Sequence, residues 1–208
     1  MRWKATSSWR LQGAVLLIAC ACAPVPLPVP PAPPLPPAPD SVPPPPCEHI
    51  TQIEVSKRER RLRAHCDGGA VVEMTVALGR EAGGAKRDAG DSRTPEGDYQ
   101  ISGPPRTSRF HRFIPIDYPS VADAEAAHAE ARLSEAAYQR IVAAHARGEP
   151  PPGDTALGGE LGFHGEGERW RGDSLHLDWT YGCVALADAD IDFLAERSEV
   201  GTPVVIRP

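Results

Sequence analysis

A segment dominated by proline divides this 208-residue chain and limits where a packed domain can begin. Residues 23–46 contain most of the 24 prolines. Proline fixes one backbone angle and removes the amide N–H, so such a run favours extended polyproline II and cannot supply a core. At about 3.1 Å per residue, a segment of this kind can hold a domain tens of ångströms from an anchor. The sequence therefore predicts a semi-rigid linker, with the folded domain starting near Cys47.

The residues before the linker have the pattern of an export signal. Arg2, Lys4 and Arg10 precede a short apolar run at residues 11–19. That run is too short to span a bilayer as a stable helix. We expect residues 1–19 to be a signal peptide and the protein to be exported to the periplasm. Removal of the signal would take away three basic residues and change the net charge from −6 to −9.

Two modes of cleavage fit this signal. The run from Leu17 to Cys20 (LIAC) is typical of bacterial lipoproteins, in which the cysteine is lipidated and becomes the new N-terminus. Simple cleavage after Ala21 is the alternative. Lipidation at Cys20 predicts that residues 20–46 are a lipid-anchor cysteine followed by the proline-rich linker, and that the folded domain is tethered to a membrane.

The five cysteines are an odd number, which suggests more than one use. In an oxidising compartment most of them should be paired or modified. Cys47 and Cys66 flank an expected hairpin and form a possible disulfide, while Cys22 is left beside the anchor. Cys183 stands far from the others. A lone thiol in an exported protein favours a function, and the alternative is a small buried apolar residue.

The folded part, residues 47–208, is predicted to be mainly β. Apolar and polar residues alternate in short runs bounded by glycine and charged turns. The expected strands cover residues 50–56, 61–66, 70–78, 98–102, 113–116, 157–165, 179–187 and 201–207. We expect a β-sandwich or barrel of short mixed strands.

A helical insertion interrupts these strands at about residues 120–148. Residues 121–131 and 134–147 are rich in alanine, and Ser134 can cap the second helix. His128 and His145 are interpreted as surface residues, since helical spacing alone gives no ligand geometry. A last short helix is expected at residues 188–197, with Asp188 as its N-cap.

The charge pattern argues against a nucleic-acid partner. The densest basic run, residues 57–63 (KRERRLR), is broken by a carboxylate and a leucine, and we interpret it as a solvated hairpin. No cluster of side chains has the spacing of metal ligands, so neither a metal nor another cofactor is expected.

Cys183 has the sequence surroundings of a nucleophile. A thiol attacks only as the thiolate, which enzymes form with a neighbouring imidazole oriented by a third group. His164 lies nineteen residues earlier, at an expected strand end beside Gly165. The backbone amides of Gly182 and Cys183 are plausible oxyanion donors. His176, seven residues before Cys183, is an alternative base or a residue of the substrate groove.

Together these residues resemble the L,D-transpeptidase catalytic domain, also called the YkuD domain. The resemblance rests on His164 with Gly165, followed by residues 180–184 (TYGCV). Residues 77–79 (ALG) and the loop 90–97 (GDSRTPEG) also look like that domain. It extends over about residues 50–207.

The resemblance implies an acyltransferase of cell-wall biogenesis, with Cys183 as nucleophile and His164 as base. The carbonyl of Gly165 would orient His164. Enzymes of this family act on peptidoglycan stem peptides. The cysteine attacks the carbonyl between a diamino acid and a terminal D-alanine, and an amine from a second stem or a lipoprotein resolves the thioester. Thr180, Tyr181, Gly182 and His176 would bind substrate.

Two positions differ from the usual family pattern. Tyr181 stands where a histidine commonly precedes Gly-Cys, and Ala185 stands where an arginine or asparagine is common. The signature is nearer to the shorter YafK-like branch, which includes enzymes that cut bonds rather than form them. Hydrolysis on the same fold, and an inactive domain that only binds peptidoglycan, are therefore the alternatives to transpeptidation.

Overall fold

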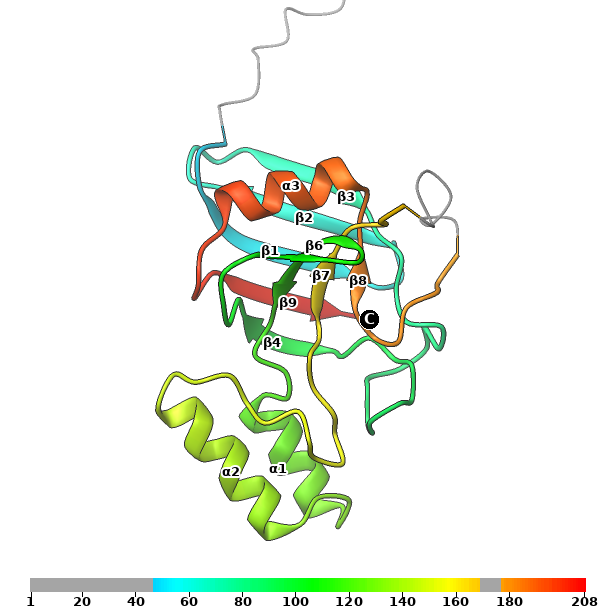
Figure 1. The fold of residues 1–208 in the computed structure, drawn as a ribbon, viewed down its shortest axis with the longest axis vertical. Helices are drawn as coiled ribbons and strands as arrows, with labels where there is room; N and C mark the ends of the chain where they lie inside the picture. The colour runs from blue at the N-terminus through cyan, green and yellow to red at the C-terminus, as the bar shows by residue number, and fades with distance from the viewer. Residues whose placement is uncertain (1–46, 169–176) are drawn as a thin grey trace, which may run out of the picture. The chain divides into compact units, whose positions relative to one another are not determined.

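The computed structural model describes residues 47–168 and 177–208 (Figure 1). In chain order its elements are β1 (Ile50–Ser56), β2 (Arg61–Cys66), β3 (Val71–Thr75), β4 (Gly97–Gln100), β5 (Arg106–Ser108), β6 (His111–Pro115), α1 (Val121–Ala129), α2 (Glu135–Ala146), β7 (Gly162–His164), β8 (Val184–Ala185), α3 (Asp188–Arg197) and β9 (Pro203–Arg207). The expected mainly β fold with a helical insertion is confirmed.

The strands form two mixed sheets. The first has the order β3-β2-β1-β9-β4, in which β9 runs parallel to β1 and antiparallel to β4. The second has the order β5-β6-β7-β8, and its last pair is parallel. The last strand of the chain thus lies inside the first sheet, paired with the first strand.

One core joins both sheets and α3. Alternate residues of the strands point inward, as in Ile53 and Val55 of β1, which are fully buried. Phe163 of β7 and Ile191 and Leu194 of α3 belong to the same cluster. The helix α3 packs against β6 and β7, so the strand that carries His164 is backed by a helix.

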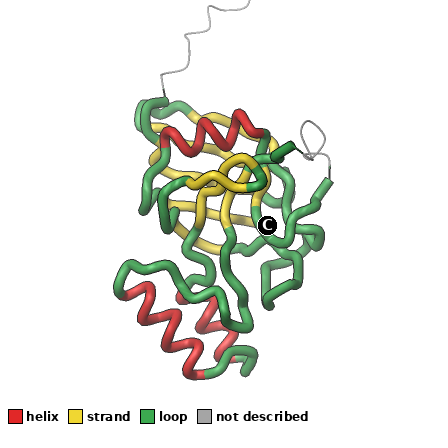
Figure 2. Tube along the Cα trace, in the orientation of Figure 1, coloured by secondary structure: helices red, strands yellow, loops and turns green. Residues whose placement is uncertain are grey.

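The helical insertion has a small core of its own, made of alanines and of Leu133, Ile141 and Leu157. Figure 2 shows α1 and α2 apart from the strands. The Ser134 hydroxyl accepts a hydrogen bond from the backbone of Ala137, at 3.3 Å, as expected of an N-cap. The expected helix 121–131 ends two residues earlier because the chain turns there, with Ala131 in a left-handed conformation.

Several expected strands are shorter in the structure. The run 70–78 pairs with β2 only up to Thr75 and then crosses to the second sheet, where Ala77 bridges Ala185 and Gly79 bridges Thr180. The runs 157–165 and 179–187 contribute only β7 and β8. The glycine-rich stretches around these strands form loops, and these loops build the candidate site.

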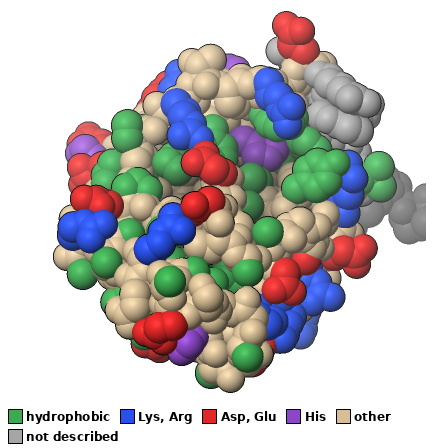
Figure 3. Space-filling model, turned by 60° about the horizontal axis from the view of Figure 1, so that its bottom comes forward, with side chains coloured by type: hydrophobic (Ala, Val, Ile, Leu, Met, Phe, Trp, Pro, Cys, Tyr) green, Lys and Arg blue, Asp and Glu red, His purple; other side chains and the backbone are tan. Residues whose placement is uncertain are grey.

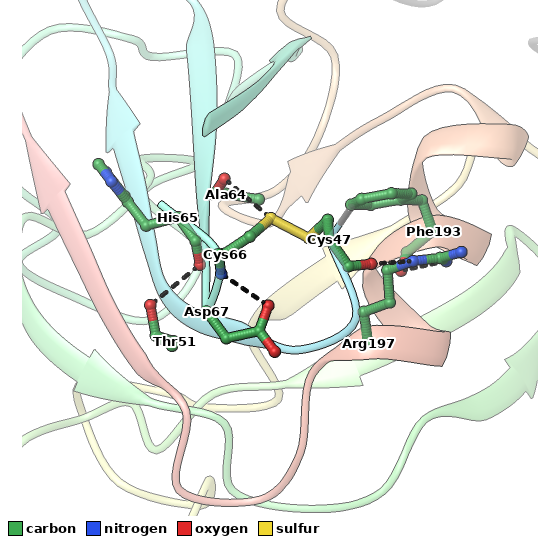
Figure 4. The surroundings of a disulfide bond; sticks show 9 residues. Cys47, Thr51, Ala64, His65, Cys66, Asp67, Phe193 and Arg197 are labelled. Atoms are coloured by element: carbon green, nitrogen blue, oxygen red, sulfur yellow. Dashed lines mark hydrogen bonds between the residues drawn. A yellow bond between two sulfur atoms is a disulfide. The ribbon is translucent and has the colours of Figure 1, made fainter. Parts of the chain in front are cut away.

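A disulfide links the start of the domain to β2. Cys47 and Cys66 are bonded with their Cα atoms 5.2 Å apart, and Figure 4 shows α3 beside this bond. The Arg197 guanidinium lies over the Phe193 ring at 4.3 Å and donates a hydrogen bond to the Cys47 carbonyl at 3.1 Å. The entry of the chain into the domain is thereby tied to both β2 and α3.

None of the helices in the described ranges has the length and apolar character that a membrane crossing requires. The expected signal peptide, Cys20 and the linker lie outside the described residues.

Candidate active site

The pairing of β7 with β8 brings His164 and Cys183 to one groove beside the second sheet. In this parallel pair Phe163 lies opposite Val184, and His164 lies opposite Ala185. Cys183 directly precedes β8, and His164 is the last residue of β7. Both side chains line one groove with a volume of about 1240 Å³.

The imidazole of His164 is buried and has a defined tautomer. Its Nδ1 lies 2.7 Å from the carbonyl oxygen of Gly165. A carbonyl can only accept, so Nδ1 carries the proton and Nε2 keeps its lone pair. Phe110 stacks on the ring with centroids 4.7 Å apart, and Trp179 packs edge-on at 5.4 Å. Burial and the charge of Arg109 hold the pKa of His164 below its usual value, which favours the neutral base.

The Cys183 side chain is the free thiol among the described cysteines. Burial raises its pKa to about 11, although the backbone amide of Gly162 and the charge of Lys86 favour the thiolate. The thiol donates a weak hydrogen bond to the Glu160 carbonyl at 3.9 Å. At neutral pH the side chain is therefore a thiol, and it needs a base before it can attack.

A tight turn holds Cys183 in place. The Thr180 hydroxyl donates to the Cys183 carbonyl at 2.7 Å and accepts from the Gly182 N–H at 3.1 Å. Gly182 has a φ of +129°, and a Cβ there would lie 2.7 Å from the Arg93 carbonyl oxygen. Only glycine fits this position. The Gly182 amide was an expected oxyanion donor, but the structure commits it to Thr180, which acts within the turn.

The loop 80–96 packs against this turn and against Gly79. Its Thr94 hydroxyl accepts a hydrogen bond from the Gly79 N–H at 2.9 Å, and a Cβ at Gly79 would lie only 2.2 Å from the Ser92 carbonyl oxygen. The backbone of residues 92–94 thus packs directly against two glycines, Gly79 and Gly182. This close packing explains why the loop needs glycine neighbours.

Lys57 anchors the same loop, contrary to the expected solvated hairpin. Its side chain is 3% exposed, and its Nζ donates to the carbonyls of Gly84 at 2.6 Å and Thr94 at 3.0 Å. It also forms an ion pair with Glu96 at 2.7 Å. The rest of the 57–63 run forms the β1–β2 turn and the start of β2. In this turn, Nε and one terminal nitrogen of Arg60 donate hydrogen bonds to the Asp178 carboxylate.

Asp91 organises the outer part of the loop. Its carboxylate accepts hydrogen bonds from Lys86 and from the backbone amides of Arg87, Asp88 and Arg93. Burial alone would raise the pKa of Asp91, but these donors lower it to about 2. The loop is thus held by a carboxylate that stays ionised at neutral pH.

Asp188 positions the chain beyond His164. We expected it to be an N-cap, but the N-cap is Ala187 and the helix starts at Asp188. Its Oδ1 instead accepts from the backbone amides of Glu166 at 2.9 Å and Gly167 at 3.2 Å. The carboxylate therefore fixes the segment whose Gly165 carbonyl orients His164. An aspartate at a helix start looks like a cap in sequence, so this role was missed.

Tyr181 lies at the mouth of the groove. Its side chain is exposed, and the guanidinium of Arg80 lies 4.5 Å from the centre of its ring. Ala185 is fully buried, so the position two residues after Cys183 supplies no polar group to the groove. His176, the alternative base, lies outside the described residues.

The charges on one face of the molecule and the possible metal ligands bear on two expectations from the sequence. On the face drawn in Figure 3, basic and acidic side chains are interspersed and no patch of a single sign dominates. Within residues 47–168 and 177–208, no group of three or more His, Cys, Asp or Glu side chains is placed to hold a metal ion.

Comparison with known families decides what kind of domain this is. A model of the L,D-transpeptidase catalytic domain, YkuD, matches residues 50–206. The chain belongs to this family. The YkuD match includes β1 to β8, all but the last residue of β9, and the described residues that line the groove. A search of curated proteins found no match.

Solved structures, several of them of proteins named L,D-transpeptidases, are similar to this chain at low identity. One from Xylanimonas cellulosilytica is 16% identical, with a TM-score of 0.41, over 79% of this chain and 64% of that one. One from Mycobacterium tuberculosis is 13% identical, with a TM-score of 0.47, over 76% of this chain and 58% of that one. The structure of Bdellovibrio bacteriovorus Bd1075 is 19% identical, with a TM-score of 0.44, over 76% of this chain and 48% of that one. The YkuD chain described here thus spans about half to two thirds of the length of these proteins.

Proposed function

We propose that this protein is an exported L,D-transpeptidase that modifies peptidoglycan stem peptides through a thioester on Cys183. The observation that carries the proposal is the pairing of β7 with β8. It brings a free thiol and an imidazole oriented by the Gly165 carbonyl into one groove, in a YkuD chain.

In the first half of the reaction, the Cys183 sulfur attacks the carbonyl between the diamino acid and the terminal D-alanine. The thiol proton passes to Nε2 of His164, the nitrogen that the Gly165 hydrogen bond leaves free. When the tetrahedral intermediate collapses, the C–N bond breaks and His164 returns the proton to the leaving amine. D-alanine departs and the thioester remains.

In the second half, an amine of another stem peptide or of a lipoprotein attacks the thioester. His164 takes the proton of this amine and returns it to the departing sulfur, so the free thiol is restored. The backbone N–H of Cys183 is our proposed oxyanion donor. The Gly182 N–H contributes only if it leaves the Thr180 hydroxyl, 3.1 Å away.

Hydrolysis is the second candidate function, and two residues favour it. Tyr181 and Ala185 replace polar residues that commonly line the substrate groove in this family, and we interpret the signature as nearer to the YafK-like branch. Water in place of the amine would release a shortened stem peptide. The chemistry at Cys183 and His164 is the same for both outcomes.

One experiment separates these functions. We would incubate the purified protein with tetrapeptide muropeptides and analyse the products by mass spectrometry. Cross-linked dimers indicate transpeptidation, and shortened monomers alone indicate hydrolysis. Stoichiometric binding without turnover indicates a peptidoglycan-binding tether. Cys183→Ala should abolish turnover, while the matched control Cys22→Ala should retain it.

We also propose that residues 1–19 direct export, that Cys20 carries the lipid anchor, and that residues 20–46 space the domain from the membrane. The support is the LIAC pattern and the proline content. Metabolic labelling with a palmitate analogue should depend on Cys20. Labelling that persists in Cys20→Ser would count against the anchor.

A further inference from the structure

Apart from His164, the basic side chains that line the groove in the described part of the chain fall into two classes. Three of them are paired with carboxylates of the domain: Lys86 with Asp91 at 2.7 Å, Arg106 with Glu160 at 2.7 Å, and His111 with Asp192 at 2.9 Å. In the described part of the chain, Arg80 and Arg109 line the same groove without a carboxylate partner. Among the described residues of the groove, these two guanidinium groups are the arginine charges that remain available to a ligand.

Arg109 belongs to the part of the groove that holds the base. Its guanidinium lies 4.8 Å from the centre of the Phe110 ring, and Phe110 stacks on His164 at 4.7 Å. The side chain is exposed. The arginine is thus held close to the imidazole by an aromatic contact, with its hydrogen-bond donors still open to a ligand.

Arg80 belongs to the part of the groove that holds the nucleophile. Its Nε donates to the Trp179 carbonyl at 3.2 Å, and its backbone N–H donates to the Thr180 carbonyl at 3.1 Å. Its guanidinium lies over the ring of Tyr181, two residues before Cys183. These contacts fix the direction of the side chain and use one of its five N–H donors.

An unpaired guanidinium in a groove is best matched by a carboxylate, which it can bind through two parallel hydrogen bonds. We propose that Arg80 and Arg109 each bind one carboxylate of the acyl donor, so that the enzyme selects stem peptides whose carboxylates are free over amidated ones. This inference rests on the proposed function and adds the chemical form of the substrate.

The mechanism assigns a carboxylate to each arginine. His164 must return its proton to the leaving amine, so the leaving residue lies beside His164 and therefore beside Arg109. Arg109 binds the terminal carboxylate of that residue. Arg80 lies on the Cys183 turn, and it binds the side-chain carboxylate of the diamino acid that becomes the acyl group.

The test uses three synthetic stem tetrapeptides. In the first, the C-terminal carboxylate and the side-chain carboxylate of the diamino acid are both free. The second has a C-terminal carboxamide, and the third has an amide in place of the diamino-acid carboxylate. For the wild type we expect each amidation to lower kcat/KM about tenfold, mainly through KM, because a charged hydrogen bond at an exposed site is replaced by a weaker one. Arg109→Gln should remove the discrimination at the C-terminus only, and Arg80→Gln the discrimination at the diamino acid only.

Arg58→Gln is the matched control, since Arg58 is exposed in the β1–β2 turn and does not line the groove. It should retain both discriminations. If either groove variant slows all three peptides equally, or if the wild type does not discriminate, the inference is wrong.

The same peptides separate this inference from the proposed function. If the wild type turns over none of them, the proposed function fails, and binding to the Cys183→Ala variant is measured by calorimetry. Preference for the free acids that disappears in the Arg80→Gln or Arg109→Gln background still supports carboxylate recognition. Equal affinity for all three peptides contradicts it.

Discussion

Replacing Lys57 by methionine should destabilise the loop 80–96, which supports the Cys183 turn. Lys57→Met keeps the length and apolar stem of the side chain and removes only the charged group. In the structure this group binds two backbone carbonyls, those of Gly84 and Thr94, and the carboxylate of Glu96. All three acceptors belong to the loop 80–96, so one substitution removes three of its hydrogen bonds.

The expected loss of unfolding free energy is about 3 kcal/mol. Removing one partner of a buried ion pair costs about 3–5 kcal/mol because the other charge is left without a partner. The value should fall near the lower end, since the Glu96 side chain is 20% exposed and water can reach it. The double variant Lys57→Met/Glu96→Gln should lose less than the sum of the two single variants, by at least about 1 kcal/mol.

The assay is urea denaturation followed by circular dichroism, together with turnover of a stem peptide under native conditions. Arg58→Met, one residue away and exposed, is the control and should stay within about 0.5 kcal/mol of the wild type. If Lys57→Met is as stable as this control, the reasoning about the buried ammonium group is refuted.

Three further predictions concern the turn, the disulfide and the thiol. Gly182→Ala should lower kcat/KM about a hundredfold, because its φ of +129° and the Arg93 carbonyl leave no room for a Cβ; steady-state kinetics near wild-type values would contradict the contact. The double variant Cys47→Ser/Cys66→Ser should lose about 3 kcal/mol, since the bond closes a loop between residues 19 apart. An unchanged denaturation midpoint would argue against that stabilisation. With a thiol pKa raised to about 11, alkylation of Cys183 by iodoacetamide should rise about tenfold per pH unit between pH 7 and 10; a rate that levels off below pH 8 would mean that the free protein already holds a thiolate.

The sequence was most informative where the chemistry depends on local pattern. His164 beside Gly165 and Cys183 after Gly182 were predicted as reactive residues from their neighbours together with the resemblance to the YkuD domain. Alternation and capping rules located the β1–β2 hairpin and the N-cap of α2 at Ser134. These features are determined by residues within one or two turns of the chain.

Local pattern could not reveal residues whose roles depend on distant partners. Lys57 belongs to a charged run that is typical of a solvated turn. In the structure it is covered by the loop 80–96, whose Gly84 and Glu96 lie 27 and 39 residues further along the chain. Asp188 looks like a helix cap, yet its carboxylate is used by the backbone that follows His164. The expected strands were too long because alternation continues where pairing partners end.

The central claim is that Cys183 carries the acyl group, and intact-mass spectrometry tests it most directly. The purified protein is mixed with a tetrapeptide stem in the absence of an acceptor amine and quenched in acid within seconds. We predict a mass increase equal to the mass of the tetrapeptide stem minus that of free D-alanine, located on the Cys183 peptide and removed by neutral hydroxylamine. An unmodified enzyme that nevertheless consumes the stem, or an adduct that persists in Cys183→Ala, would contradict the account.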